Sequence, residues 1–189
     1  MLPHLDFLDD QIQQLTDAIA TELGPTGQAA VALATTITGV AARTAEVLLA
    51  EIGTDMSVFP TARHLASWAG RCPGNDQSAG KRRSGRTRNG SQWLAKALEE
   101  AAMAAIRTRD SYLQAQYKRL KPRLGHGRAL GAVKHSMLIA YWHMFTTGQT
   151  YHDLGGDYNQ RRDPARATKR LIARLEALGH HVTLQPAAP

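Results

Sequence analysis

The sequence predicts an all-α fold, and three observations carry that prediction. Aromatic residues make up only 6% of the chain, Ala and Leu are abundant, and runs of β-branched residues are few. Apolar residues recur at steps of three and four over most of the length. The 189 residues, 43% of them hydrophobic, allow one or two small domains with a sizeable core. We therefore expect a helical core.

The first element is an amphipathic helix over residues 2–23 that ends at Gly24 and Pro25. Its apolar face has heptad-like spacing and consists of Leu5, Leu8, Ile12, Leu15, Ile19 and Leu23. This face is either core for the chain or the seam of a coiled coil with another copy. A first helix with no preceding domain has little else to cover it, so we favour a homo-oligomer formed through this helix.

Residues 37–53, ITGVAARTAEVLLAEIG, predict two helices joined by a tight hairpin. We expect one helix over residues 26–37, a break at Thr38 and Gly39, and a second helix over residues 41–52. In a helix-hairpin-helix, Gly39 lets a nucleic-acid backbone approach closely, and the N–H groups opening the second helix bind a phosphate. A tight helical hairpin without a ligand has the same pattern, so both interpretations stay open.

Further helices are expected after residue 60. Thr61 is the expected N-cap of a short helix in which Trp68 is a core residue. Ser91 or Asn89 is the expected N-cap of a long helix that has Trp93 on its apolar face. The remaining predicted elements are a helix over residues 112–120, a loop over residues 125–127, a central apolar helix over residues 130–145, a basic helix over residues 165–178 and a short strand over residues 181–184.

The basic segment, residues 72–91, differs in composition from its surroundings. It contains five cations and no acid after Asp76, and its four glycines predict a flexible loop without helix or strand. Arginine binds phosphate oxygens bidentately and stays charged, so this segment is predicted to bind nucleic acid. A solvated basic linker is the alternative. The predicted nucleic-acid-binding residues are Lys81, Arg82, Arg83, Arg86 and Arg88, together with Gly39 of the hairpin.

The charge distribution supports a polyanionic partner. Residues 1–60 hold one basic residue and eight acids, a net charge of −7, whereas residues 71–128 hold fourteen basic residues and four acids, a net charge of +10. Such a field suits a nucleic-acid surface, because counterion release supplies most of the affinity. Basic stripes also occur as ordinary solvated faces.

Several other classes of site are excluded or disfavoured. The stretch from Gly74 to Lys81 has five residues between its glycines where a Walker A loop has four, and Arg82 stands where Ser or Thr should bind magnesium. The eight histidines show no metal-binding spacing, and core roles are favoured for His135 and His143 over a metal role. Paired carboxylates for two-metal chemistry are also missing, so we expect no metal site in this chain.

The expected environment is the cytoplasm. The single cysteine, Cys72, cannot form an internal disulfide, which fits a reducing compartment. No apolar run approaches the roughly 18–20 residues that a membrane span needs, and the N-terminus lacks the regions of a signal peptide. We expect a soluble protein with no membrane partner.

The candidate for covalent chemistry is a serine among the arginines. The basic segment holds four small hydroxyl side chains, Ser78, Ser84, Thr87 and Ser91. A serine that attacks a phosphodiester needs positive donors to stabilise the developing charge, and this segment supplies them. No general base is evident from the sequence.

Four stretches together resemble the C-terminal transposase domain of the IS110 family of insertion-sequence transposases. They are the hairpin ITGVAARTAEVLLAEIG, the segment FPTARHLASWAGRCPGNDQSAGKRRSGRTRNGSQWL, and the later RALGAVKHSMLIAYWHMFTTGQTYHDLGGDY and RRDPARATKRLIARLEALGHHVTL. The resemblance covers residues 36–184, and its most specific part is SAGKRRSGR after a WAG-x-C-P segment. Members of this family are DEDD-type, serine-dependent recombinases guided by a bridge RNA.

The resemblance implies roles for individual residues. Ser78 matches the family's catalytic serine, which forms a covalent link to DNA, and Ser84 is the second choice. Family members carry an N-terminal RuvC-like domain whose four acids hold magnesium in a composite active site. This chain is expected to lack that domain, to hold no cofactor itself and to be inactive alone.

The resulting domain prediction has three parts. Residues 1–35 are a coiled-coil-like helical segment, residues 36–184 a helix-hairpin-helix-containing transposase domain, and residues 185–189 a disordered tail. The predicted function is that of a transposase C-terminal domain that binds DNA and guide RNA. The alternative is a non-catalytic nucleic-acid-binding or assembly module that associates with a full-length transposase.

Overall fold

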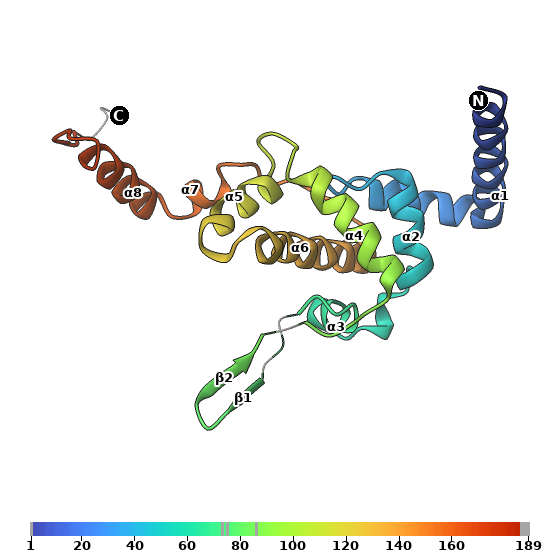
Figure 1. The fold of residues 1–189 in the computed structure, drawn as a ribbon, viewed down its shortest axis with the longest axis horizontal. Coiled ribbons are helices and arrows are strands. Elements are labelled where there is room, and N and C mark those ends of the chain that lie inside the picture. Colours follow the sequence, from blue (N-terminus) through green and yellow to red (C-terminus); the bar gives the residue numbers. More distant parts are fainter. Residues whose placement is uncertain (1, 73, 75, 86, 186–189) are drawn as a thin grey trace.

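The protein is helical throughout its body. The structure, a computed structural model, describes residues 2–72, 74, 76–85 and 87–185. The prediction of an all-α fold is confirmed, with one small β-hairpin added to it (Figure 1). The elements of the described residues are α1 (Leu2–Thr35), α2 (Ala42–Ile52), the 3₁₀ turn η1 (Met56–Val58), α3 (Ala62–Trp68), β1 (Asp76–Ser78), β2 (Lys81–Ser84), α4 (Gln92–Ala105), α5 (Tyr112–Leu124), α6 (His126–Thr147), α7 (Tyr158–Arg162) and α8 (Pro164–Glu176).

Helix α6 is the centre of the core, as its apolar sequence predicts. Helices α3, α4 and α5 pack against it, and its residues Val133, Leu138 and Tyr141 are almost completely buried. The Tyr141 hydroxyl donates a hydrogen bond to the Gly53 carbonyl oxygen over 2.9 Å, and burial raises the pKa of this hydroxyl. The predicted loop over residues 125–127 is wrong in extent. Only Gly125, with φ 77°, leaves the helical region, and α6 begins at His126.

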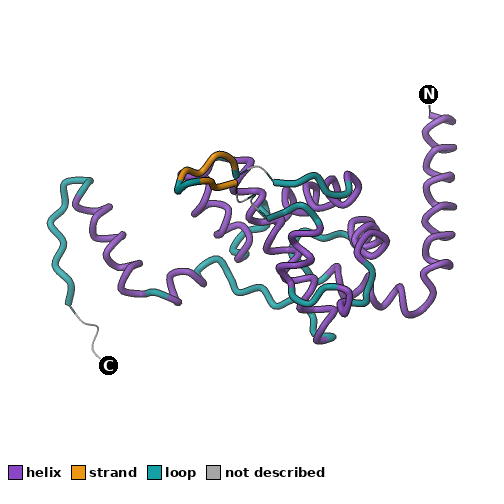
Figure 2. Tube along the Cα trace, turned by 90° about the horizontal axis from the view of Figure 1, so that it is seen from below, coloured by secondary structure: helices purple, strands orange, loops and turns teal. Residues whose placement is uncertain are grey.

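Helix α1 consists of two helical pieces, which confirms the predicted break. Gly24 has φ 58° and ψ −173°, values that an α-helix cannot accommodate. The piece after the break packs on α2 through Ala30 and Ala34. The piece before it projects from the body (Figure 2), and its apolar side chains from Leu5 to Leu15 are exposed, Ile12 by 61% and Leu15 by 65%. Ile19 and Leu23, close to the break, are half-buried and line a groove with α2. The first four positions of the heptad-like face are therefore not core in this chain.

The turn between α1 and α2 is pressed against α4. Gly39 has φ 90°, and a Cβ built on it would overlap the Ala101 carbonyl oxygen and lie 2.6 Å from the backbone nitrogen of Ala105. Ile37 and Val40, on either side, are buried. Helices α1 and α2 are joined by a turn that contains Gly39, as the sequence predicts. The glycine at this position allows the backbone of the turn to contact the backbone of α4.

One carboxylate connects this turn with the segment that follows α6. Asp153 accepts hydrogen bonds from the Thr38 hydroxyl over 2.9 Å and from the Tyr112 backbone N–H over 2.8 Å. It also accepts one from the Gly155 N–H over 2.8 Å. Asp153 therefore joins the α1–α2 turn to the beginning of α5.

Four local predictions differ from the structure. Trp93 is 64% exposed because it lies one position before the buried stripe that begins at Leu94, and one residue is a rotation of about 100° on a helix. Trp68 is half exposed, with one side of its ring against Phe59 at a centroid distance of 5.4 Å. Helix α5 continues through Pro122 to Leu124. Residues 181–184 form no strand, because no described segment pairs with them.

The ends of the chain lie on opposite sides of the body (Figure 1). Helix α8 begins at Pro164 with the Arg166 N–H bound to the Asp163 side chain, close to the predicted start at residue 165. Of the predicted tail, only Gln185 belongs to the described residues. Within the described residues, no helix has the length and apolar character needed to cross a membrane.

The contact of Gly39 with α4 leads to a stability prediction. Gly39→Ala should lower the free energy of unfolding by about 2–4 kcal/mol, because the new Cβ meets backbone atoms and Ala disfavours a positive φ. Gly131→Ala is the matched control, since a Cβ there meets nothing within 4 Å and Ala favours the helix by about 0.5–1 kcal/mol. Urea unfolding of both variants measures the effect. Equal stability of Gly39→Ala and the native chain would show that α1–α2 and α4 are less closely packed.

Candidate nucleic-acid interface

The basic segment forms a β-hairpin that projects beyond α3 (Figure 1). Strands β1 and β2 are antiparallel, and their connection, Ala79 and Gly80, has φ 49° and 74°. Two successive positive φ angles are typical of a type I′ turn, whose twist matches that of the strands it joins. The prediction of a loop without strand is wrong here, because Gly80 forms the turn that pairs the two flanking strands.

The hairpin brings two predicted site residues together at its tip. Ser78 ends β1, Lys81 begins β2, and the two are directly opposite each other. Directly opposite residues of an antiparallel pair carry their Cβ atoms on the same face, about 5 Å apart. Both side chains are exposed. A serine hydroxyl and a cation are thus side by side at the tip of the hairpin.

The second serine of the prediction has a different position. Ser84 ends β2 and is opposite Asp76, at the other end of the hairpin. At about 3.3 Å per residue, Lys81 and Ser84 are separated by roughly 10 Å along the strand. The backbone therefore distinguishes Ser78 from Ser84: only Ser78 is at the tip.

The root of the hairpin is fixed by two glycines. A Cβ on Gly70 would lie 2.5 Å from the Arg88 carbonyl oxygen, and a Cβ on Gly90 would lie 2.5 Å from the Ala69 carbonyl oxygen. The two legs of the hairpin thus touch through their backbones just before α4. Ser91 then caps α4, as predicted, by accepting the Leu94 N–H over 3.3 Å.

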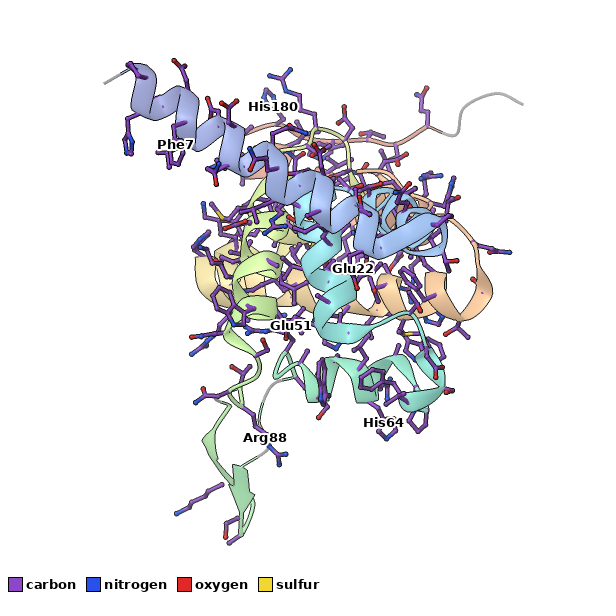
Figure 3. All side chains as sticks on the ribbon, turned by 90° about the vertical axis from the view of Figure 1, so that its right-hand side faces the viewer. Phe7, Glu22, Glu51, His64, Arg88 and His180 are labelled. Carbon is purple, nitrogen blue, oxygen red and sulfur yellow. The ribbon has the colours of Figure 1, made fainter. Side chains whose placement is uncertain are left out.

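Two of the five predicted cations of the basic segment have side chains that the structure describes. Arg88 is exposed on the leg between β2 and α4 (Figure 3), and Lys81 is exposed at the tip. Arg82 and Arg83 are in β2, but their side chains are outside the described ones, and Arg86 is outside the described residues altogether. The roles predicted for these three arginines therefore remain predictions.

Gly39 is not close to the basic segment. It contacts α4 at Ala101 and Ala105, whereas the basic segment joins α4 at Gln92. Nine residues of helix between Gln92 and Ala101 correspond to about 14 Å. Contact with α4 already accounts for a glycine at this position, and its predicted contact with a phosphate remains a prediction.

Two histidines that the sequence analysis considers do lie together. His135 and His143 line a groove of about 530 Å³, and His152 from the following segment lines it too. Burial lowers the pKa of His135, and the nearby positive charge of Arg63 lowers it further. In the part of the chain that the structure describes, no group of three or more His, Cys, Asp or Glu side chains is arranged to hold a metal ion.

A second exposed basic cluster lies at residues 118–128, where α5 meets α6. The motif-based prediction does not include it, because it matches no motif that we recognise. Its only signal in the sequence is five basic residues within eleven positions and no acid.

Comparison with protein families identifies the domain. Residues 31–118, just under half of the chain, match the model of the Transposase IS116/IS110/IS902 family. This match supports a transposase domain of this family in residues 31–118. The matched region of the transposase domain includes the α1–α2 turn, the whole basic segment and Ser78. No curated protein matches the chain.

The match confirms the family that the sequence resembles and, with it, a function in transposition. It ends at residue 118, so the predicted extension of the transposase domain to residue 184 remains a prediction. The division of the chain into residues 1–35, 36–184 and 185–189 likewise remains a prediction.

Proposed function

We propose that the transposase domain binds DNA through the basic segment and that Ser78 forms a covalent link to a DNA phosphate. The observation that carries this proposal is the pairing of Ser78 with Lys81 at the tip of a projecting hairpin. Both side chains are exposed, so a phosphodiester can reach them without a change in the helical body. The location of the pair within the matched region of a transposase family supports the same role.

The chemistry is a substitution at phosphorus. The Ser78 hydroxyl loses its proton to a base, and its oxygen bonds to the phosphorus atom. One bridging P–O bond breaks, and the departing deoxyribose oxygen takes up a proton. The Lys81 ammonium group can stabilise negative charge on a non-bridging oxygen of the same phosphate. A serine hydroxyl is a weak nucleophile until a base removes its proton, so the pair needs a further group.

By the family resemblance, magnesium belongs to a RuvC-like domain that completes the site. The described residues do not fit such a centre, because none of their acids is grouped for metal binding. We therefore assign no step to the metal here. In our proposal the acids come from outside these 189 residues, and Ser78 reacts only in the composite site.

The same positive surface fits a guide RNA, which the resemblance implies. RNA and DNA share the phosphate backbone, and the net charge of +10 on residues 71–128 attracts both. The non-catalytic alternative, a module that only binds nucleic acid or a full-length transposase, has the same charge requirement. The two functions differ in whether Ser78 reacts.

The first test concerns affinity. If the five cations of the basic segment neutralise about five phosphates, they should contribute about −4 to the slope of log K against log salt. Replacing Arg82, Arg83 and Arg86 together by Ala should reduce the magnitude of that slope by about 2–3. Fluorescence anisotropy with labelled duplex DNA measures it. The control, with the same change in charge, is Arg166→Ala with Lys169→Ala and Arg170→Ala on α8, and equal slopes for both triple variants would place the DNA elsewhere.

The second test separates an enzyme from a binding module. The isolated chain should bind DNA without forming an adduct. Adding a RuvC-like domain from a matching transposase, guide RNA and magnesium should give a protein–DNA link that survives denaturation. Ser78→Ala should abolish this link, while Ser84→Ala, at the other end of the hairpin, should retain it. An adduct formed by Ser78→Ala would exclude Ser78 as the nucleophile, and an adduct formed by the isolated chain would show that the second domain is dispensable.

The third test concerns association of copies through α1. Ile12→Asn with Leu15→Asn should lower the mass seen by sedimentation toward the 20.6 kDa of one chain, because both side chains are exposed on the heptad-like face. Asp10→Asn with Asp17→Asn, on the other face of the helix, should leave the mass unchanged. A native chain that sediments as one copy at high concentration would contradict the proposed homo-oligomer.

A further inference from the structure

The corner where α5 joins α6 is strongly basic and fully accessible. We define it as the α5–α6 corner, residues 118–128. Its five cationic side chains are all exposed and are Lys118, Arg119, Lys121, Arg123 and Arg128. Their spread on α5, from Lys118 to Arg123, is about 8 Å along the helix axis. Four of the five charges thus lie within about 8 Å along α5, and Arg128 follows in the first turn of α6.

These charges are not neutralised locally. The sequence from Ser111 to Arg128 contains no acid. Within the described residues the ion pairs are Arg43 with Glu46, Lys134 with Glu99, and Arg161 with Asp157, and none of these includes a cation of the corner. Like charges at this density repel one another, so the corner carries an unfavourable energy that a polyanion relieves.

The backbone of the α5–α6 corner has free space beside its glycines, whereas the backbone of the α1–α2 turn is covered by α4. A Cβ on Gly39 would meet the backbone of α4, so that turn is occupied by the protein itself. A Cβ on Gly125 or on Gly127 would meet nothing within 4 Å. Unlike the α1–α2 turn, the α5–α6 corner therefore leaves room for another backbone.

The corner is also held in one shape. The Tyr117 hydroxyl and Nδ1 of His126 form a hydrogen bond of 2.7 Å across the turn, and their rings meet edge to face at 5.8 Å. The Lys121 ammonium group lies 5.6 Å from the centre of the Tyr117 ring. Tyr117 is itself buried, so the cations of the corner stand on a rigid base.

We infer that the α5–α6 corner is a second DNA-binding surface, which contacts the phosphate backbone of a duplex. This inference rests on the proposed function, because it adds a contact to the DNA that the basic segment binds. Figure 1 shows the hairpin below the helical body and the α5–α6 corner at its left end, both away from the first half of α1. One DNA molecule can therefore meet both surfaces.

Two features favour duplex DNA over a single strand of DNA or RNA. Sites for single strands combine cations with exposed aromatic rings on which bases stack. Within residues 118–128 the only aromatic ring is the His126 imidazole, and it is hydrogen-bonded to the Tyr117 hydroxyl. Phosphates follow each other every 3.4 Å of axis along one strand of a duplex, so 8 Å of basic surface meets two or three of them. Contacts of this kind position a duplex without reading its sequence.

The test compares two triple variants of the full chain. The corner variant loses three charges through Arg119→Ala, Arg123→Ala and Arg128→Ala. The basic-segment variant loses three through Arg82→Ala, Arg83→Ala and Arg86→Ala. Each should reduce the magnitude of the salt slope for a 30-base-pair duplex by about 2.7, to the same extent for unrelated sequences. Raising salt from 50 to 200 mM should then weaken binding about 40-fold less than for the native chain. The α8 triple variant again controls for net charge, and all three corner side chains are exposed, so circular dichroism should show an unchanged fold.

The outcomes distinguish this inference from the proposed function. If the corner variant keeps the native slope while the basic-segment variant loses it, the corner does not bind DNA and the proposed function stands. If neither variant changes the slope, both proposals fail. Repeating the titration with single-stranded RNA and with duplex RNA of the same length tests the choice of partner. A corner effect confined to either RNA would overturn the assignment to duplex DNA.

Discussion

The burial of α6 fixes the position of the β1–β2 hairpin. Helices α3 and α4 both pack on α6, and the basic segment connects the end of α3 to the beginning of α4. The two legs of the hairpin then meet backbone to backbone at Gly70 and Gly90, where no side chain fits between them. The hydrogen bond from the Trp142 indole to the Phe59 carbonyl oxygen, 2.9 Å long, also ties the segment before α3 to α6. A change in the packing of α6 is therefore expected to move the root of the hairpin, and with it Ser78.

The helices could be predicted from the sequence because their signals are local. Apolar residues at steps of three and four, the break at Gly24 and the cap at Ser91 all act within one or two helical turns. The hairpin could not be predicted in the same way. Its glycines read as helix and strand breakers, whereas Gly80 supplies the positive φ of a turn and the strands depend on each other for their hydrogen bonds. Trp68 and Trp93 differ from the prediction for a related reason: their large apolar side chains predict burial, but the exposure of each depends on the angle at which its helix packs.

For the candidate site, the sequence proposes residues but does not give their arrangement in space. Composition and family resemblance indicated Ser78 and the cations around it, but only the strand register places Lys81 opposite Ser78 and Ser84 at the other end. The helix-hairpin-helix pattern adds Gly39 to the predicted nucleic-acid-binding residues, although Gly39 and the basic segment are at different ends of α4. The charge of the α5–α6 corner was visible in the sequence as part of the +10 of residues 71–128. Its accessibility and the open space at Gly125 became visible only in the fold.

The distribution of charge over this shape allows DNA binding and self-association at the same time. Residues 1–60, with a net charge of −7, include the projecting half of α1, whereas the hairpin and the α5–α6 corner carry the positive charge on the other side of the body (Figure 1). A polyanion that approaches the chain is attracted to the positive side and repelled from α1, because the field of the whole molecule steers it before contact. The apolar face of α1 then stays available for a second copy while DNA is bound. A pair of copies joined through α1 would present two hairpins, each with the Ser78 that we propose as the nucleophile.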